Sequence, residues 1–308
     1  SSSRYMTEHF KNFANWLNDK YLSSGSKLVD IGSNDGTFLK NFKNKNIDAL
    51  GYEPSSTIAN LANKKGIKTF DKFFNTSNLD LIKSFHNDVD IISSANVIAH
   101  IPDLTNVIKC VDKLLSNNGL LVFEEPYMGS MFSKVSYDQI YDEHIFMFSV
   151  SSIKKVFSLF DFELIDALPQ ITHGGSMRYV VGRRRKHQIN DNVRKIIDEE
   201  QKNKLDTVDS CIQFKKNCEN SKINTIKKIE EFKSQNKKIC GYAATAKSTT
   251  VLNYCGINNK MIDFICDTTK EKIGKFSPGS HIPIVPVSDF HKSKPDIAFL
   301  FAWNHNCL

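Results

Sequence analysis

The spacing of apolar residues changes repeatedly along the chain, from helical spacing to short continuous runs. Residues 7–22 place apolar side chains at helical spacing and predict a helix. Short apolar runs, typical of buried parallel strands, follow at 27–32, 48–53, 89–94 and 119–124. Helices are predicted between them, from about Asp35, after Ser55 as N-cap, and over 104–115. This alternation predicts a doubly wound α/β fold, with a parallel sheet covered on both faces.

The alternation pauses at Pro126. Residues 127–149 are rich in aromatic, acidic and histidine side chains, and we interpret them as a site loop or lid. A helix and strands return over 150–182, and a polar, Lys-rich helical stretch follows. A second α/β unit begins at Lys238, with strand, small-residue loop and helix. We predict a main α/β domain, a helical bridge and a smaller Rossmann-like domain, over residues 1–185, 186–236 and 237–308.

Composition narrows the class of protein. The 308 residues are 40% hydrophobic and 24% charged, which is ordinary for a globular protein and excludes a disordered or collagen-like chain. The net charge of +7 is spread along the chain, so we expect no nucleic-acid partner. The one dense basic patch, Arg183–Lys186, is expected to be a solvated helix start. No stretch approaches the ~20 apolar residues of a membrane span, and residues 1–5 resemble neither a signal peptide nor a natural start, so a fragment is expected.

The seven cysteines are odd in number, and no C-x-x-C motif occurs. A disulfide framework or a zinc knuckle is therefore not expected, and we predict no metal ligands in this chain. Reduced thiols fit a cytoplasmic location, which we predict.

The loop after the first predicted strand is a candidate nucleoside site. Its candidate ligand-binding residues are Asp30, Gly32, Asn34, Asp35 and Gly36. Glu53 ends the second strand, where an acid can accept hydrogen bonds from ribose hydroxyls. Asn34 replaces the middle glycine of a dinucleotide motif, and a P-loop lysine is lacking. These features favour S-adenosylmethionine (SAM) over NAD; a dinucleotide site and a ligand-free turn remain alternatives.

Five further segments occur in a recognisable order: Asn96–Ile101, Glu124–Tyr127, Tyr137–His144, His173–Arg178 and Gly241–Lys247. Together they resemble the SAM-dependent C-methyltransferases that act on nucleotide-linked ketosugars in branched deoxysugar biosynthesis. The resemblance covers essentially the whole chain. It implies a class I methyltransferase domain followed by a smaller Rossmann-like domain.

The resemblance also implies a zinc-binding N-terminal domain and a C-terminal extension, neither of which this sequence contains. A zinc ion is expected only in that absent domain. The second residue of the Y-x-E-H motif, frequently His in the family, is Asp142 here.

The resemblance implies specific site residues. His144 matches the general base, Glu143 and Tyr141 match its partners, and His100 and Asn96 match site residues after the strand 89–94. The glycine loop and Glu53 match the SAM site, to which Asn96 also belongs. Phe73 is a candidate adenine contact, with core packing as the alternative.

Two segments are candidates for binding an anionic substrate. The run that holds His173, Gly175, Ser176 and Arg178 offers backbone amides and a guanidinium, which suit a diphosphate or sugar hydroxyls; a tight turn is the alternative. Lys247 and Ser248 fall at a predicted helix N-terminus, where a phosphate can bind. The loop 274–283 is expected near the nucleotide half of the substrate.

The chemistry explains the residue types. A carbon beside a ketone becomes nucleophilic only after it loses a proton, and a histidine with an ordinary pKa of ~6.5 suits that task. Glu143 or Asp142 could orient the imidazole, and His100 or Tyr141 could donate to the enolate oxygen. We predict a C-methyltransferase acting on a nucleotide diphosphate 4-keto-deoxysugar. Alternatives are an O- or N-methyltransferase on a small metabolite and a non-catalytic binding module. The oligomeric state is open, and a monomer is compatible with the sequence.

Overall fold

The computed structural model describes residues 3–43, 45–85 and 88–303. Contacts divide the chain into two compact units. Unit 1 comprises Ser1–Met128 and Ile145–Lys202, and unit 2 comprises Gly129–His144 and Asn203–Leu308. Among the described residues, no helix has both the length and the apolar character needed to cross a bilayer.

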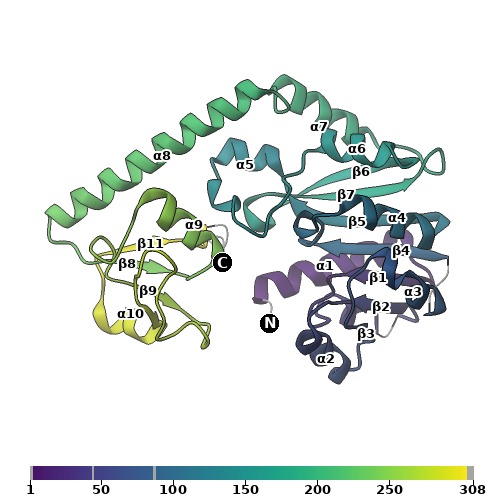
Figure 1. Ribbon diagram of the computed structural model, residues 1–308, viewed down its shortest axis with the longest axis horizontal. Helices are drawn as coiled ribbons and strands as arrows, with labels where there is room; N and C mark the ends of the chain where they lie inside the picture. The colour runs from purple at the N-terminus through teal and green to yellow at the C-terminus, as the bar shows by residue number, and fades with distance from the viewer. Residues whose placement is uncertain (1–2, 44, 86–87, 304–308) are drawn as a thin grey trace. The chain divides into compact units, whose positions relative to one another are not determined.

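Unit 1 is built on a seven-stranded sheet of order β3-β2-β1-β4-β5-β7-β6 (Figure 1). Its strands are β1 Lys27–Ile31, β2 Asp48–Tyr52, β3 Thr69–Phe70, β4 Val89–Ala95, β5 Leu115–Pro126, β6 Phe162–Gln170 and β7 Ser176–Arg183. The pairs β1/β2, β1/β4 and β4/β5 are parallel, as predicted from the alternation, whereas β7 runs antiparallel to both β5 and β6, an orientation that the sequence analysis did not predict. Only residues 171–175 join β6 to β7, and a parallel pair needs a crossover of a dozen or more residues.

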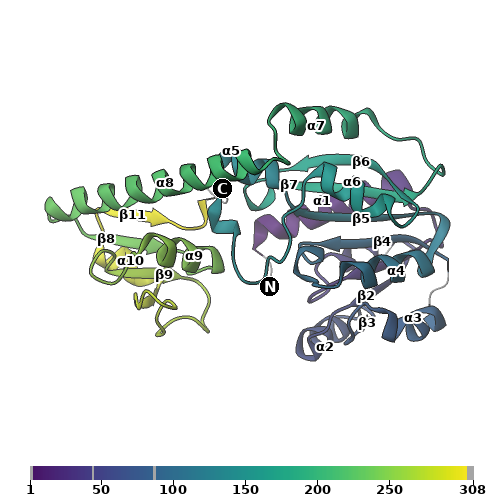
Figure 2. The same ribbon diagram turned by 45° about the horizontal axis from the view of Figure 1, so that its top comes forward.

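Helices cover both faces of this sheet. They are α1 Arg4–Tyr21, α2 Ser56–Lys64, α3 Leu79–Phe85, α4 Leu104–Leu114, α6 Val150–Ser158 and α7 Asp191–Lys202. Successive side chains of β1 enter different cores: Leu28 packs with Phe13 of α1, and Val29 packs in the cluster that holds Val107 of α4 and Ile153 of α6. Figure 2 shows α7 over β6. The predicted doubly wound α/β fold is confirmed.

Three local expectations differ from the structure. Instead of a helix from Asp35, turns lead to a short 3-10 helix, η1 Leu39–Phe42, because Gly36 takes a left-handed φ of 77° that interrupts a helix. Ser55 is the N-cap of α2, but its side chain makes no capping hydrogen bond. The basic patch is not a helix start: Arg183 ends β7 and pairs with Asp112, and a turn follows.

Unit 2 holds a parallel four-stranded sheet of order β10-β9-β8-β11. Its strands are β8 Ile239–Tyr242, β9 Phe264–Asp267, β10 Ile284–Pro286 and β11 Ile297–Leu300. Its helices are α5 Met128–Lys134, α8 Val208–Ser234, α9 Ala246–Cys255 and α10 Val287–Ser293. The first residue of α5, Met128, is still counted in unit 1. Ile229 of α8 and Leu252 of α9 bury their side chains in one core with Ile265 of β9. The strand β10 was not predicted.

The two units differ from the predicted domain boundaries in two places. Residues 129–144 belong by their contacts to unit 2, and the predicted bridge 186–236 is divided, with α7 in unit 1 and α8 in unit 2. α7 contributes Val193 to the core of unit 1. Such contacts are non-local, and the polar composition of 186–236 gave no indication of them.

Candidate active site

The loop after β1 lies at the carboxyl edge of the sheet in unit 1. The amides of Gly32 and Ser33 both donate to the carbonyl of Tyr52, at 2.8 and 3.0 Å, which joins the loop to the end of β2. Gly32 has a φ of 67°, and a Cβ atom there would lie 2.4 Å from Cγ2 of Val97. A glycine is therefore required both by the backbone conformation and by the close approach of Val97.

Glu53 follows β2 and faces the same loop. Its Oε2 accepts a hydrogen bond from the amide of Asn34 at 3.1 Å, and its Oε1 accepts one from the amide of Ser55 at 2.9 Å. Each carboxylate oxygen has a second lone pair. The carboxylate is thus held in place with acceptor capacity to spare, as a ribose-binding acid requires.

The two aspartates of the loop have different environments. Asp30 is buried in β1, and its Oδ1 accepts a hydrogen bond from the Ser93 hydroxyl at 2.7 Å; burial raises the pKa of Asp30 to about 7. Burial also acts to raise the pKa of Asp35, but the ammonium of Lys65, 2.8 Å away, and the hydroxyl of Thr37 outweigh it and lower that pKa. Asp35 is therefore engaged by protein groups, and Asp30 lies beneath the loop.

The remaining predicted SAM residues lie in separate places. The side chain of Phe73 is 66% exposed, whereas its neighbour Phe74 is buried against Tyr52. Asn96 follows β4 in a left-handed conformation, with a φ of 58°. Its Oδ1 is buried and has no hydrogen-bond partner among the described residues. His100 ends the short 3-10 helix η3 Ile98–His100 that follows.

Two consecutive glutamates close β5, and the sequence analysis gave neither of them a role. Glu124 is buried and binds two side chains: Arg178 at 2.6 Å and Nε2 of His9 at 2.6 Å. Oε1 of Glu125 accepts from the three successive amides of residues 97–99. Two acids in succession at the end of an apolar strand were the feature of the sequence that could have revealed them.

The predicted substrate residues of unit 1 lie in the β6–β7 turn, which holds His173 and Gly175, and at the start of β7, which holds Ser176 and Arg178. Ser176 pairs with Pro126, so this turn lies at the carboxyl end of β5, on the same edge as the loop after β1. The guanidinium of Arg178 is buried, and its Cζ lies 4.1 Å from the centre of the Phe13 ring. The ion pair with Glu124 and this stacking on Phe13 together explain why a guanidinium is buried here, with no ligand needed.

The other three predicted substrate residues have local roles. His173 takes a left-handed φ of 54°, and the Ser176 hydroxyl donates to the carbonyl of Thr172 at 3.1 Å. The carbonyl of Gly175 accepts from the amide of Tyr127 at 3.1 Å. These contacts are those of a tight turn, which was the alternative to a substrate-binding segment.

His144 lies in unit 2, and its ring has two hydrogen-bond partners. Nδ1 lies 2.7 Å from the carbonyl oxygen of Gln139, and Nε2 lies 3.0 Å from the hydroxyl of Tyr141. A carbonyl can only accept, so Nδ1 carries a proton and donates it to the Gln139 carbonyl, while Nε2 and the Tyr141 hydroxyl share the second hydrogen bond. The side chains of Asp142 and Glu143 are exposed, and the orienting group is the Gln139 backbone, which the sequence analysis missed.

Lys247 and Ser248 begin α9 in unit 2. The hydroxyl of Ser248 is buried and donates to the carbonyl of Thr245 at 2.6 Å, so it serves the helix itself. Burial lowers the pKa of Lys247, and the negative charge of Asp138 opposes this shift. Asp138 also accepts from Nε1 of Trp303 at 3.0 Å.

A cavity of about 310 Å³ opens at the start of α9. It is bounded by Thr245, the N-cap of α9, by Thr249 of α9, by the charged residues Glu271, Lys272 and Lys275, and by part of the loop 274–283. The ammonium of Lys272 donates to the carbonyl of Ala244 at 2.7 Å. The predicted nucleotide loop thus borders a cavity that carries positive charge.

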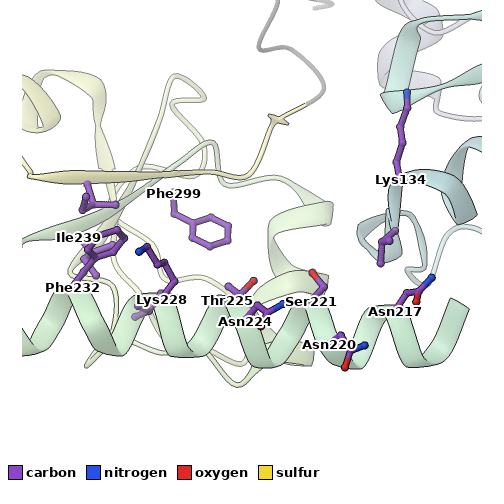
Figure 3. A pocket seen from close by; sticks show the side chains of 13 residues that line it. Lys134, Asn217, Asn220, Ser221, Asn224, Thr225, Lys228, Phe232, Ile239 and Phe299 are labelled. Carbon is purple, nitrogen blue, oxygen red and sulfur yellow. The ribbon is translucent and has the colours of Figure 1, made fainter. Parts of the chain in front are cut away.

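A second cavity of unit 2, of about 710 Å³, lies along α8. Figure 3 shows Asn224, Thr225 and Lys228 on the helix and Phe299 among the residues that line this cavity. None of the predicted site residues lines it. Within the described ranges, no group of three or more His, Cys, Asp or Glu side chains is arranged to hold a metal ion.

Comparison with known proteins gives the family. A model described as a methyltransferase domain matches residues 4–167, more than half of the chain, and a C-methyltransferase C-terminal domain model matches residues 171–307. The chain is 28% identical to the C-methyltransferase NovU of Streptomyces niveus over 285 residues, which is 92% of this chain and 68% of that protein.

Solved structures with similar folds are more distant. An S-adenosylmethionine-dependent methyltransferase from Clostridium acetobutylicum is 13% identical, with a TM-score of 0.46, covering 59% of this chain and 93% of that one. Magnesium protoporphyrin IX methyltransferase from Synechocystis, solved with bound SAH, is 12% identical, with a TM-score of 0.45, covering 58% of this chain and 83% of that one.

The fold of unit 1 is that of a class I methyltransferase. The chain belongs to the methyltransferase family, and its C-terminal part matches the C-methyltransferase C-terminal domain. The prediction of a C-methyltransferase enzyme is confirmed.

Proposed function

We propose that the protein transfers a methyl group from SAM to a carbon beside the ketone of a nucleotide diphosphate 4-keto-deoxysugar, with His144 as general base. The observation that carries this proposal is the ring of His144. Its Nδ1 proton is held by the Gln139 carbonyl, which leaves Nε2, 3.0 Å from the Tyr141 hydroxyl, as the nitrogen that can act as a base.

The residues of unit 1 fit SAM. Gly32 offers a surface that a Cβ atom would obstruct, Glu53 keeps acceptor capacity for ribose hydroxyls, and the Oδ1 of Asn96 is buried without a protein partner among the described residues. When bound, SAM supplies an electrophilic methyl group. Phe73, the candidate adenine contact, is exposed enough to be available.

The chain's own residues would then supply the acid–base chemistry. Nε2 of His144 takes the proton from the carbon once the Tyr141 hydroxyl has turned away from it, and that hydroxyl or an imidazole N–H of His100 donates to the developing enolate oxygen. The amide of Ile145, the next residue after His144, donates to the carbonyl of Ala99 at 3.0 Å, beside His100. Oriented proximity of reacting groups supplies ~7–11 kcal/mol in favourable systems.

The nucleotide half of the substrate is proposed to bind in unit 2. The cavity at the start of α9 has hydroxyl groups and two lysines on its walls, which suit a diphosphate. We assign Lys272 and Lys275 to this role; Lys247, predicted for it from the sequence, does not line this cavity. The buried Ser248 hydroxyl donates to the Thr245 carbonyl and so stabilises the N-terminus of α9; we do not assign it a direct contact with the diphosphate.

The relative NovU is named a C-methyltransferase, and we propose the same reaction type for a sugar substrate here. All described cysteines are free thiols, which supports a cytoplasmic enzyme. A nucleic-acid partner is not part of the proposal, since the only substrate it needs is the nucleotide sugar.

The test is turnover together with proton exchange. Purified protein with SAM and a panel of nucleotide diphosphate 4-keto-deoxysugars should give S-adenosylhomocysteine and a product heavier by one methylene. Without SAM, deuterium from solvent should enter the carbon beside the ketone. Product without such exchange would favour O- or N-methyl transfer; binding without product would indicate a binding module.

The role of His144 is tested by His144→Ala. We expect kcat to fall about 10²–10⁴-fold and deuterium exchange to stop, while SAM affinity is unchanged. His291→Ala, on an exposed position of α10, is the matched control and should leave both rates intact. Wild-type exchange in His144→Ala would remove His144 as the base.

A further inference from the structure

Glu125 has an unusual set of hydrogen bonds at the carboxyl end of β5. Its Oε1 accepts from the amides of Val97 at 2.9 Å, Ile98 at 2.6 Å and Ala99 at 3.2 Å. Three successive N–H groups that converge on one oxygen fix the backbone of the segment that donates them. Glu125 therefore determines the conformation of residues 97–99.

The second oxygen of Glu125 has no compensating partner. Oε2 is buried, and none of the described residues forms a hydrogen bond to it. The titratable groups that interact with it are Glu124 on β5 and Tyr179 on β7, and no ion pair of Glu125 with a cation is found among the described residues. In this setting a buried carboxylate costs more free energy than a neutral carboxylic acid does.

The energetics agree with this geometry. Burial raises the pKa of Glu125 to about 8, the three amides act to lower it, and the charge of Glu124 raises it further. The hydroxyl of Tyr179 is also buried without a partner among the described residues, and the pKa of Tyr179 is raised by burial. Glu125 thus holds its proton at neutral pH.

The backbone that Glu125 holds carries candidate site residues at both ends. Asn96 precedes the three amides and His100 follows them. Val97 is the side chain against which Gly32 packs so closely that a Cβ atom would be 2.4 Å away. The position of residues 97–99 therefore determines the position of both loops at the carboxyl edge of the sheet.

We propose that Glu125 is a positioning residue for methyl transfer, which acts as a neutral carboxylic acid to hold residues 96–100 in the conformation that the reaction requires. This inference rests on the proposed function, because that function gives Asn96 and His100 their roles. Glu125 itself acts through the loop rather than on the substrate.

Two variants separate the hydrogen bond from the charge. Glu125→Gln keeps an acceptor oxygen and is neutral at every pH, whereas Glu125→Met keeps the volume and removes the acceptor. We expect Glu125→Gln to retain most of the kcat at pH 7 and Glu125→Met to lose about 100-fold, the cost of a small misplacement. A Gln variant as inactive as the Met variant would overturn the proposal.

The pH profile is the readout that packing alone would not change. Wild-type kcat should fall above pH 8, because ionised Glu125 is a buried charge without a cation and is drawn toward water, which displaces residues 97–99; this fall should be absent in Glu125→Gln. An identical fall in both proteins would contradict the proposal.

Infrared spectroscopy tests the neutral acid without any substrate. The carbonyl stretch of a protonated carboxyl group should be present in wild-type protein at pH 7 and missing from Glu125→Gln. If the two spectra do not differ in this band, the proposal is overturned, even when the protein folds and binds SAM. If the band is present but no ketosugar is methylated, the proposed substrate is wrong, and the neutral state of Glu125 is still supported.

Discussion

Glu124 and Glu125 are neighbours on β5, but their side chains lie on opposite faces of the sheet and have different partners. Glu124 faces α1, where Arg178 and His9 both bind its carboxylate. Glu125 faces the other core, where its Oε1 accepts hydrogen bonds from three backbone amides. Among the described residues it forms no ion pair with a cation. Both side chains are at most 1% exposed, so burial cannot explain the difference.

The contrast shows that the partners of a buried acid determine its charge. Burial acts to raise the pKa of Glu124, but the hydrogen bond from His9 and the charge of Arg178 outweigh it, so the pKa falls below its usual range. For Glu125 the same burial dominates and raises the pKa to about 8. One acid is an anion in a structural ion pair, and the other is a neutral group beside the candidate site.

The largest effect is expected from breaking the ion pair. Glu124→Ala leaves the Arg178 guanidinium buried and uncompensated, which should lower the free energy of unfolding by about 3–5 kcal/mol. Urea denaturation at pH 7 measures it. The double variant Glu124→Met with Arg178→Met should recover much of that loss, because no charge remains buried. A double variant less stable than Glu124→Ala would show that the pair itself is strongly stabilising.

The next effect is the opposite pH dependence of the two acids. The pKa of Glu125 is higher in the folded chain than its ordinary 4.5, so its contribution to stability is present below pH 4.5 and is lost as pH rises toward about 8. The slope is at most one proton, about 1.4 kcal/mol per pH unit. For Glu124 the pKa is lowered, so its contribution is present above 4.5 and is lost as pH falls below that value.

Urea titrations of wild-type protein and Glu125→Gln between pH 4.5 and 8 check this prediction. The difference in unfolding free energy should shift in favour of the Gln variant as pH rises. Parallel curves would mean that Glu125 is already ionised in the folded protein.

A smaller effect is expected at His9. His9→Leu removes one hydrogen bond to the Glu124 carboxylate but leaves Arg178 in place, so a loss of about 1.5–3 kcal/mol is expected. Denaturation at pH 7 measures it beside Glu124→Ala. A loss as large as that of Glu124→Ala would mean that His9, and not Arg178, is the main partner.

The smallest effect concerns a third buried acid in unit 1. Glu200 of α7 accepts from the hydroxyl of Tyr127 at 2.9 Å and from the amides of Val150 and Ser151 at the start of α6. Tyr127→Phe removes one of several neutral donors and should cost about 0.5–1.5 kcal/mol in denaturation experiments. A cost above that of His9→Leu would overturn the order proposed for charged and neutral partners.

The sequence determined the local features of this protein. Apolar periodicity predicted most strands and helices, and the glycine loop with Glu53 predicted a nucleoside site, because these depend on residues close together in the chain. The ordered motifs predicted the C-methyltransferase family.

Only the tertiary structure decided the partners of the polar groups. The antiparallel β7, the Gln139 carbonyl that sets the tautomer of His144, and the stacking of Arg178 on Phe13 all join groups that the chain pattern leaves unrelated. Glu124 and Glu125 are identical in sequence terms and differ only in what the two faces of the sheet bring to them. Charge and proton position depend on contacts in space, which periodicity does not encode.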